Sequence, residues 1–173
     1  IPAPYWVSYP QMVLLAEGTP VYIDAPIEQD FKITPEQLEQ AITPKTRAII
    51  LCSPSNPTGS VYSKDELEAL KNVLLKHENV IVIADEIYEH INYIGEHASM
   101  AMFDDIKDRV VIINGVSKAY AMTGWRIGFI AAPEWIVKGC NKLQGQYTSG
   151  PCSVSQTAAE AAFAGEQQCV EDM

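Results

Sequence analysis

The amino-acid sequence predicts an α/β fold built around a largely parallel sheet. Short β-branched runs alternate with helix-like patterns from residue 18 to residue 131, which is typical of consecutive βαβ units. Residues 47–52 and 80–84 are nearly continuous apolar runs, as expected for strands that are buried on both faces. A chain of 173 residues is also long enough to bury one core without disulfides or metals.

The first part of the chain is predicted to contain a loop, a short helix, a strand and a second helix. The second helix has the clearest signals, because Thr34, Pro35 and Gln37 form a capping box with proline at the first helical position. It is expected to run to about residue 42. The loop, the first helix and the strand are expected at residues 1–6, 9–17 and 20–25.

The rest of the chain repeats the order of strand, crossover and strand. Ser63 and Glu66 form a second capping box, and apolar residues at helical spacing continue that helix to about residue 77. Further strands are predicted at residues 109–113 and 127–132, and further helices at residues 133–144 and 158–173, the last without an end signal.

The composition is that of an ordinary globular protein with an acidic balance. Hydrophobic residues make up 47% and charged residues 20%, and the longest apolar runs have the length of strands, so no membrane span is predicted. The formal net charge is -10 and the 12 Lys and Arg are scattered, which argues against nucleic acid or an anionic membrane as a partner. Any anion must therefore be bound by local groups.

The four cysteines form no CxxC pair and do not lie beside the three histidines in the sequence: Cys52, Cys140, Cys152 and Cys169. Because zinc-site spacing is absent, no metal is expected, and reduced thiols in a cytoplasmic protein are the simpler interpretation. The chain starts without Met and without a signal-peptide pattern. It is expected to be part of a longer chain.

Polar residues follow three of the predicted strands at the same end. Asn56 comes after the strand at 47–52, Asp85 after the strand at 80–84, and Ser117 with Lys118 after the strand at 109–113. In parallel α/β sheets the ligand crevice lies at the carboxyl ends of the strands. These side chains are therefore expected to converge in space.

Three sequence blocks carry the strongest functional signal. They are residues 53–59 (SPSNPTG), 84–88 (ADEIY) and 114–128 (NGVSKAYAMTGWRIG). In order and approximate spacing they resemble three blocks of class I pyridoxal-phosphate-dependent aminotransferases, and three blocks in register are a strong signal. The resemblance covers essentially the whole chain, and residues 4–10 (PYWVSYP) are similar to the subgroup of aspartate and prephenate aminotransferases.

This resemblance implies the fold type I large domain, a three-layer α/β/α sandwich with a mainly parallel mixed sheet, truncated here at both ends. Residues 1–173 would be part of the domain that binds pyridoxal 5'-phosphate. Three parts of such enzymes would lie outside the chain: the small domain, the upstream phosphate loop and the arginine that binds the substrate carboxylate. The full-length homodimer would transfer amino groups between an amino acid and a 2-oxo acid such as 2-oxoglutarate, in a biosynthetic process, and the chain alone is expected to be inactive.

The resemblance gives Lys118 and Asp85 the central roles. Lys118 would hold the cofactor as an internal aldimine and then move a proton between the substrate and the cofactor. Asp85 would pair with the protonated pyridine nitrogen, so that the ring can accept electrons. Taken alone, Lys118 is also compatible with a surface lysine, and Asp85 with a helix N-cap.

The resemblance also assigns ligands for the phenolic oxygen and the phosphate. Tyr88 and Asn56 would hydrogen-bond the phenolic oxygen, and the bond between Asn56 and Pro57 is a candidate cis peptide. Arg126 would bind the phosphate through two parallel N–H bonds, with Ser117 as a second phosphate ligand. The alternatives are an aromatic at the sheet edge for Tyr88, a turn residue for Asn56 and a surface ion pair for Arg126.

Trp6 would stack on the pyridine ring, and both Trp6 and Asn56 would face the substrate. The alternative for Trp6 is a core or interface aromatic. The aromatic residues Tyr5, Tyr9 and Trp125 are assigned to packing, and the role of Tyr120 is left open.

One position departs from the family pattern. Many members have serine or threonine three residues before the lysine, and this chain has Gly115 there. Ser117 is the nearest substitute, so part of the phosphate site stays in doubt from the sequence.

Three other interpretations remain open. The first is another fold type I enzyme, such as a cystathionine β-lyase-like C–S lyase or an aminocyclopropane carboxylate synthase, because these use the same lysine and aspartate. The second is the ligand-sensing domain of a transcription regulator, which a basic winged-helix domain upstream would reveal. The third is a bare α/β module in which every motif residue is structural.

Overall fold

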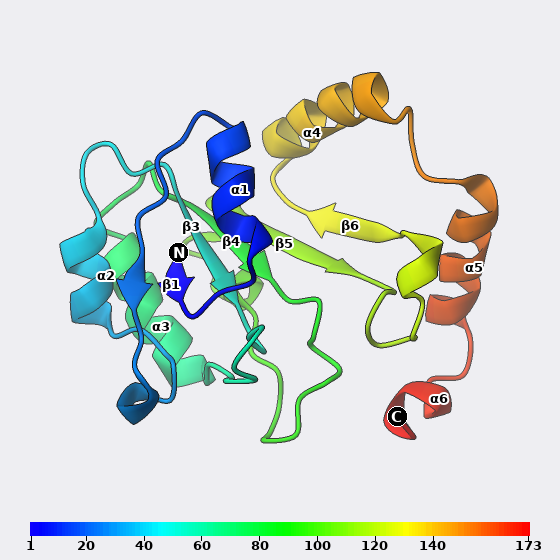
Figure 1. Ribbon diagram of the computed structural model, residues 1–173, viewed down its shortest axis with the longest axis horizontal. Helices are drawn as coiled ribbons and strands as arrows, with labels where there is room; N and C mark the ends of the chain where they lie inside the picture. The colour runs from blue at the N-terminus through cyan, green and yellow to red at the C-terminus, as the bar shows by residue number, and fades with distance from the viewer.

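A four-stranded sheet forms the centre of the computed structural model, which describes residues 1–173 (Figure 1). Its strands are β3 (Ala48–Cys52), β4 (Ile81–Asp85), β5 (Val110–Gly115) and β6 (Gly128–Ala131), in that spatial order. β3, β4 and β5 are parallel, and β6 is antiparallel to β5. The strands predicted at residues 47–52, 80–84, 109–113 and 127–132 and the mainly parallel mixed sheet are confirmed, so the carboxyl ends of β3, β4 and β5 share one edge.

The amino-terminal strands differ from the prediction. β1 (Pro2–Ala3) and β2 (Ile23–Asp24) pair in parallel as a separate two-stranded sheet. Residues 1–6 were predicted as a loop and residues 20–25 as a strand, so the first prediction was wrong and the second was too long. A two-residue strand has no alternation of apolar and polar residues, which is the signal that identifies strands in a sequence.

The helices with capping boxes agree closely with the sequence. α2 (Pro35–Ala41) begins after Thr34 and α3 (Lys64–Leu74) begins after Ser63, and both capping boxes are formed. The predicted first helix is α1 (Ser8–Leu15). Short 3-10 helices occupy some of the connections: η1 (Ile27–Gln29), η2 (Met100–Met102), η3 (Lys107–Arg109) and η4 (Thr123–Trp125).

The last part of the chain contains α4 (Glu134–Tyr147), α5 (Ser153–Ala164) and α6 (Gln168–Glu171). The single helix predicted for residues 158–173 is therefore wrong, because α5 ends before Gly165 and a new short helix follows. Gly165 is the C-cap of α5 in extended conformation, and a Cβ there would lie 2.8 Å from the Ala161 carbonyl oxygen. A glycine at this place is an end signal.

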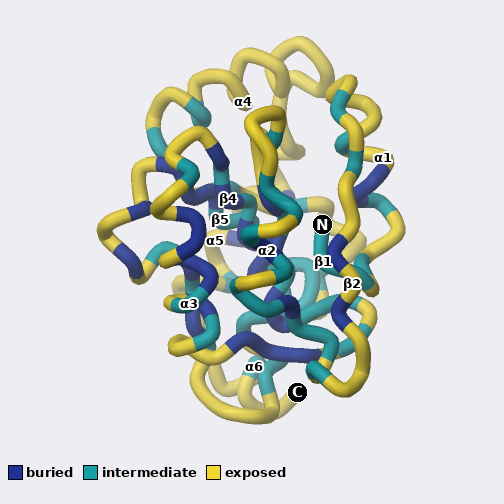
Figure 2. Tube along the Cα trace, turned by 90° about the vertical axis from the view of Figure 1, so that its left-hand side faces the viewer, coloured by how far each residue is buried: buried dark blue, intermediate teal, exposed yellow.

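The main core lies where α2 and α3 pack with β3 and β4. It is a cluster of 19 buried residues that includes Leu38, Leu70, Leu74 and Val82. α4 has no buried residue, and Figure 2 shows its trace mostly in the colour of exposed residues, whereas buried segments gather around the sheet and α3. None of the helices is long and apolar enough to cross a membrane.

Candidate functional site

Side chains from three strand ends lie together at the carboxyl edge of the sheet. Asn56 follows β3, Tyr88 lies in the turn after β4, and Lys118 follows β5. The Asn56 amide nitrogen donates to the Tyr88 hydroxyl at 3.3 Å, and the Lys118 Nζ is 5.6 Å from the centroid of the Tyr88 ring. The structure thus brings together three of the residues that the sequence placed at one site.

Asp85 is the last residue of β4 and is buried, with 9% of its surface exposed. It pairs with Cys52 of β3 and Ile113 of β5, so the sheet holds its backbone on both sides. Its Oδ1 accepts from the Ile87 amide at 3.2 Å. No α-helix follows β4, so the alternative of a helix N-cap is wrong; the carboxylate caps a turn instead.

Tyr9 contacts Asp85 from α1, and sequence reasoning missed this contact. The Tyr9 hydroxyl donates to Asp85 Oδ2 at 2.6 Å, and its ring meets the Trp6 ring edge-on at 5.5 Å between centroids. Tyr9 was assigned to packing; it is indeed buried, but it also has a polar role. The one available signal was that a buried tyrosine needs a partner for its hydroxyl.

The other aromatic residues of this region vary in exposure. Trp6 is 39% exposed beside Tyr9, so one part of its indole is free to meet a ligand. Tyr5 stacks on Tyr22 at 5.1 Å, which agrees with a packing role. Trp125 is 45% exposed, so its assignment to packing within this chain is wrong.

The Lys118 amine has no hydrogen bond and no ion pair within the chain. Its side chain is half-buried and lies over the Tyr88 ring, which is a cation–π contact. A lysine on an open surface would be more exposed. Half-burial without a carboxylate partner leaves the amine available for another group.

Arg126 lies in the connection between β5 and β6, which also contains Ser117 and Lys118. It has a left-handed backbone, with φ of 55°, and its Nη1 donates to the Thr123 carbonyl oxygen at 2.8 Å. It forms no ion pair, so the alternative of a surface ion pair is not seen, and most of its N–H groups are free. The Ser117 hydroxyl forms no hydrogen bond within the chain, and Ser117 is half-buried.

The glycine that departs from the family pattern has a steric reason. Gly115 is the last residue of β5 and pairs with Gly128, the first residue of β6. A Cβ at Gly115 would lie 2.7 Å from the Ile127 carbonyl oxygen and 2.9 Å from the Gly128 Cα. A serine cannot enter this place unless the two strands move apart.

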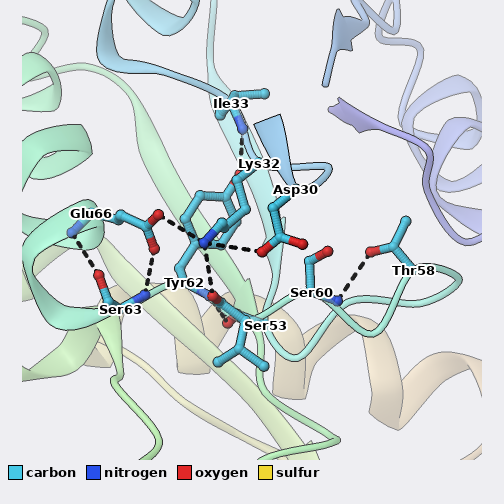
Figure 3. Close-up of polar contacts among 10 residues, drawn as sticks. Asp30, Lys32, Ile33, Ser53, Thr58, Ser60, Tyr62, Ser63 and Glu66 are labelled. Atoms are coloured by element: carbon cyan, nitrogen blue, oxygen red, sulfur yellow. Dashed lines mark hydrogen bonds and ion pairs between the residues drawn. The ribbon is translucent and has the colours of Figure 1, made fainter. Parts of the chain in front are cut away.

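Polar contacts hold the loop that carries Asn56 (Figure 3). The Ser53 hydroxyl accepts from the Tyr62 amide at 3.1 Å, and the Tyr62 hydroxyl accepts from the Ile33 amide at 2.8 Å. Lys32 pairs with Glu66 at 2.8 Å. The peptide bond between Asn56 and Pro57 is cis, as the sequence suggested. This network joins both ends of the loop to the segment before α2.

A second cluster of polar groups lies beside the site. Glu86, Glu89 and His97 bring potential ligand atoms within 4.8 Å of one another. The buried Glu86 already accepts from Ser99 at 2.8 Å and pairs with His97 at 3.0 Å. Because these partners satisfy the carboxylate, we interpret the cluster as a structural anchor for the loop after β4. Sequence reasoning looked for cysteine spacing and did not find it.

The comparisons with known proteins identify the family and the fold of the chain. The family model described as "Aminotransferase class I and II" matches residues 1–173. An aspartate/prephenate aminotransferase from Nitrosomonas europaea is 54% identical over the whole chain, which covers 44% of that protein. Among solved structures, an aspartate aminotransferase from Rhizobium meliloti is 44% identical with a TM-score of 0.97, and the match covers 99% of this chain and 43% of that one.

An aromatic aminotransferase from Pyrococcus horikoshii is similarly close, with 42% identity and a TM-score of 0.96, over 99% of this chain and 47% of that one. The expected α/β fold of the family is therefore confirmed. The chain spans less than half of the length of these relatives. On the match to its entire length, the chain belongs to the class I and II aminotransferase family.

Proposed function

We propose that the full-length protein is a pyridoxal-phosphate-dependent aminotransferase in which Lys118 holds the cofactor. The observation that carries the proposal is the group formed by Lys118, Tyr88 and Asn56 at the strand ends, next to the buried carboxylate of Asp85. Membership of the family supports it. Residues 1–173 would then be part of the domain that binds the cofactor.

The side chains of the site fit the chemical groups of pyridoxal phosphate. Asp85 offers a carboxylate to a protonated ring nitrogen, and Tyr88 and Asn56 offer a phenol and an amide to a phenolic oxygen. Arg126 offers free N–H groups to a phosphate, with Ser117 beside it in the same connection. Trp6 offers an exposed aromatic face.

When bound, the cofactor supplies a ring that accepts electron density from the Cα of the amino acid. Lys118 would bind the carbonyl carbon of the cofactor covalently, leave it when the amino acid takes its place, and then carry a proton at Cα. Asp85 would keep the ring nitrogen protonated, and Arg126 would fix the phosphate end. Asp85 ends β4, and Lys118 and Arg126 lie in the connection from β5 to β6, so the paired strands β4, β5 and β6 hold the backbones from which these groups extend.

We also propose the class of substrates from the names of the relatives. These names indicate aspartate or an aromatic amino acid as the donor and prephenate as an acceptor. Another 2-oxo acid, such as 2-oxoglutarate, would serve as an acceptor in the same reaction. The amino group of one partner and the keto oxygen of the other exchange places, so no further reactant is consumed. The working unit would be a cytoplasmic homodimer.

The test is to express the full-length protein and record its absorption with added cofactor. We expect an absorption band at a longer wavelength than that of the protein itself. Lys118→Ala should remove this band, and Lys142→Ala, in the exposed helix α4, should leave it unchanged. Borohydride reduction followed by peptide mass analysis should place the cofactor mass on the peptide with Lys118. A band that persists in Lys118→Ala would contradict the proposal.

Activity distinguishes aminotransfer from the neighbouring chemistries. Aspartate or phenylalanine with 2-oxoglutarate should give glutamate, measured with a coupled assay, and Lys118→Ala should give none. Release of pyruvate and ammonia from cystathionine, without glutamate formation, would indicate a C–S lyase instead.

A further inference from the structure

The hydrogen bond between Tyr9 and Asp85 joins two elements that are distant in the sequence. Tyr9 lies in the first turn of α1, and Asp85 ends β4, 76 residues later. The 2.6 Å distance is that of a strong O–H···O bond to a carboxylate. Both residues are buried, with 6% and 9% of their surfaces exposed, so water competes little for this bond.

The two carboxylate oxygens of Asp85 are held from different directions. The Ile87 amide donates to Oδ1 at 3.2 Å from the turn after β4, and Tyr9 donates to Oδ2 from α1. Two donors fix the rotation of the carboxylate about its last bond. An ionised carboxylate has about four acceptor positions, so it keeps the capacity to accept a further N–H group.

Tyr9 is suited to act only as a donor. Burial, together with the neighbouring Cys52 and Asp85, raises the pKa of the Tyr9 phenol far above its usual range. The phenol therefore keeps its proton at neutral pH. A permanent donor stabilises the ionised form of its acceptor.

Tyr9 also contacts the second residue that is proposed to meet the cofactor ring. Its ring packs edge-on against Trp6, so one side chain contacts both the proposed partner of the ring nitrogen and the proposed stacking face. We infer that Tyr9 is a positioning residue, which holds the carboxylate of Asp85 in the orientation that pairs with a protonated pyridine nitrogen. This inference rests on the proposed function.

The test uses Tyr9→Phe in the full-length protein, because phenylalanine keeps the contact with Trp6 and removes only the hydroxyl. We expect the Kd for pyridoxal phosphate to rise about ten-fold, as for the loss of one hydrogen bond to a charged group. The pH midpoint of the cofactor absorption should move upward. The reason is that the Lys118 nitrogen, when bonded to the cofactor, holds its proton more tightly if the cofactor ring carries less positive charge.

Tyr120→Phe is the matched control for the loss of a tyrosine hydroxyl that bonds a distant side chain. The Tyr120 hydroxyl donates to Gln167 Oε1 at 2.7 Å, and it forms no hydrogen bond with Asp85. This variant is expected to lower Tm while leaving the pH midpoint of the absorption unchanged. Equal shifts of the midpoint in both variants, or none in Tyr9→Phe, would overturn the inference.

A double-mutant cycle with Asp85→Asn gives the decisive comparison. If Tyr9 acts through Asp85, then Tyr9→Phe should change the midpoint far less in the Asp85→Asn background than in the wild type. Additive shifts would contradict the inference and leave the proposed function intact. If the wild type forms no band that depends on Lys118, the proposed function fails and the inference fails with it.

Discussion

The guanidinium of Arg126 makes one hydrogen bond within the chain, to a backbone carbonyl three residues earlier, and no ion pair. An exposed arginine in this state keeps a planar set of donors for a planar or tetrahedral anion. In a protein with a net charge of -10, the proposed phosphate site would need such a local cation. Its role is tested most directly by a change that keeps the charge.

Arg126→Lys is predicted to raise the Kd for pyridoxal phosphate about ten-fold, because lysine cannot form two parallel hydrogen bonds with one phosphate. Titration of the full-length protein with pyridoxal phosphate measures this Kd. Arg47→Lys is the matched control, since Arg47 is exposed and also donates to a carbonyl three residues earlier, that of Pro44. An equal change in both variants would show that Arg126 does not bind the phosphate.

Sequence reasoning located the residues at the strand ends but not the one that reaches them from a helix. Asn56, Asp85 and Lys118 each follow an apolar run, and the rule that parallel strands end at one edge is enough to bring them together. The contact of Tyr9 depends on how α1 docks against the sheet. No local pattern encodes that docking, because an 8-residue helix has few side chains to define an apolar face.

Among the elements, those with capping boxes were predicted closely and those without local signals were not. α2 and α3 begin directly after Thr34 and Ser63, because a serine or threonine side chain satisfies an amide that the helix leaves free. β1 and β2 have two residues each, and their pairing is set by tertiary contacts. The pairing of β5 with β6 depends on the close approach of their two backbones, where Gly115 pairs with Gly128.

Gly115→Ala is predicted to destabilise the protein by about 1–3 kcal/mol, because its Cβ would press on backbone atoms of Ile127 and Gly128. Gly139→Ala, in α4, has no atom within 4 Å of the added Cβ and should be stabilising by up to about 1 kcal/mol. Urea unfolding measures both. Effects of the same sign would argue against the close approach of the strands.

The pair of Lys32 and Glu66 at the start of α3 predicts a dependence of stability on pH. Burial alone would raise the pKa of Glu66, but hydrogen bonds from Lys32 and the Ser63 amide outweigh it and lower that pKa. The stabilisation from the ionised carboxylate is therefore fully present above the unfolded pKa of about 4.3. It is lost as the pH falls through the lower pKa of the folded state.

Glu66→Gln should thus lower Tm at pH 7, and the difference from the wild type should shrink below about pH 4. Glutamine can still complete the capping box, so the change tests the charge. Glu68→Gln, on the same helix and 3.8 Å from Lys71, is the control and is expected to change Tm less. A difference that is constant from pH 7 to pH 3 would contradict this prediction.

For the molecule as a whole, the distribution of exposed apolar side chains is uneven. β6, α4 and α5 have large hydrophobic residues with 43–66% of their surfaces exposed: Phe129, Trp135, Leu143, Val154 and Phe163. These elements lie at the end of the sheet opposite to α2 and α3 (Figure 1). Large exposed apolar surface is usually covered in a complete protein.

The 173-residue chain by itself is predicted to bind pyridoxal phosphate weakly and to show no turnover, because it spans less than half of its relatives. Cofactor titration and the glutamate assay, run beside the full-length protein, measure this. A turnover number for the isolated chain within ten-fold of the full-length protein would contradict it.

The connection from β5 to β6 contains both Lys118 and Arg126, and its two ends meet where Gly115 pairs with Gly128. The proposed covalent anchor of the cofactor and its proposed phosphate ligand thus lie on one hairpin. The separation of Lys118 and Arg126 depends on the register between β5 and β6. A slip of one residue between β5 and β6 would shift Gly128, and with it the segment that contains Arg126, by roughly 3 Å relative to Lys118, which is about the length of a hydrogen bond.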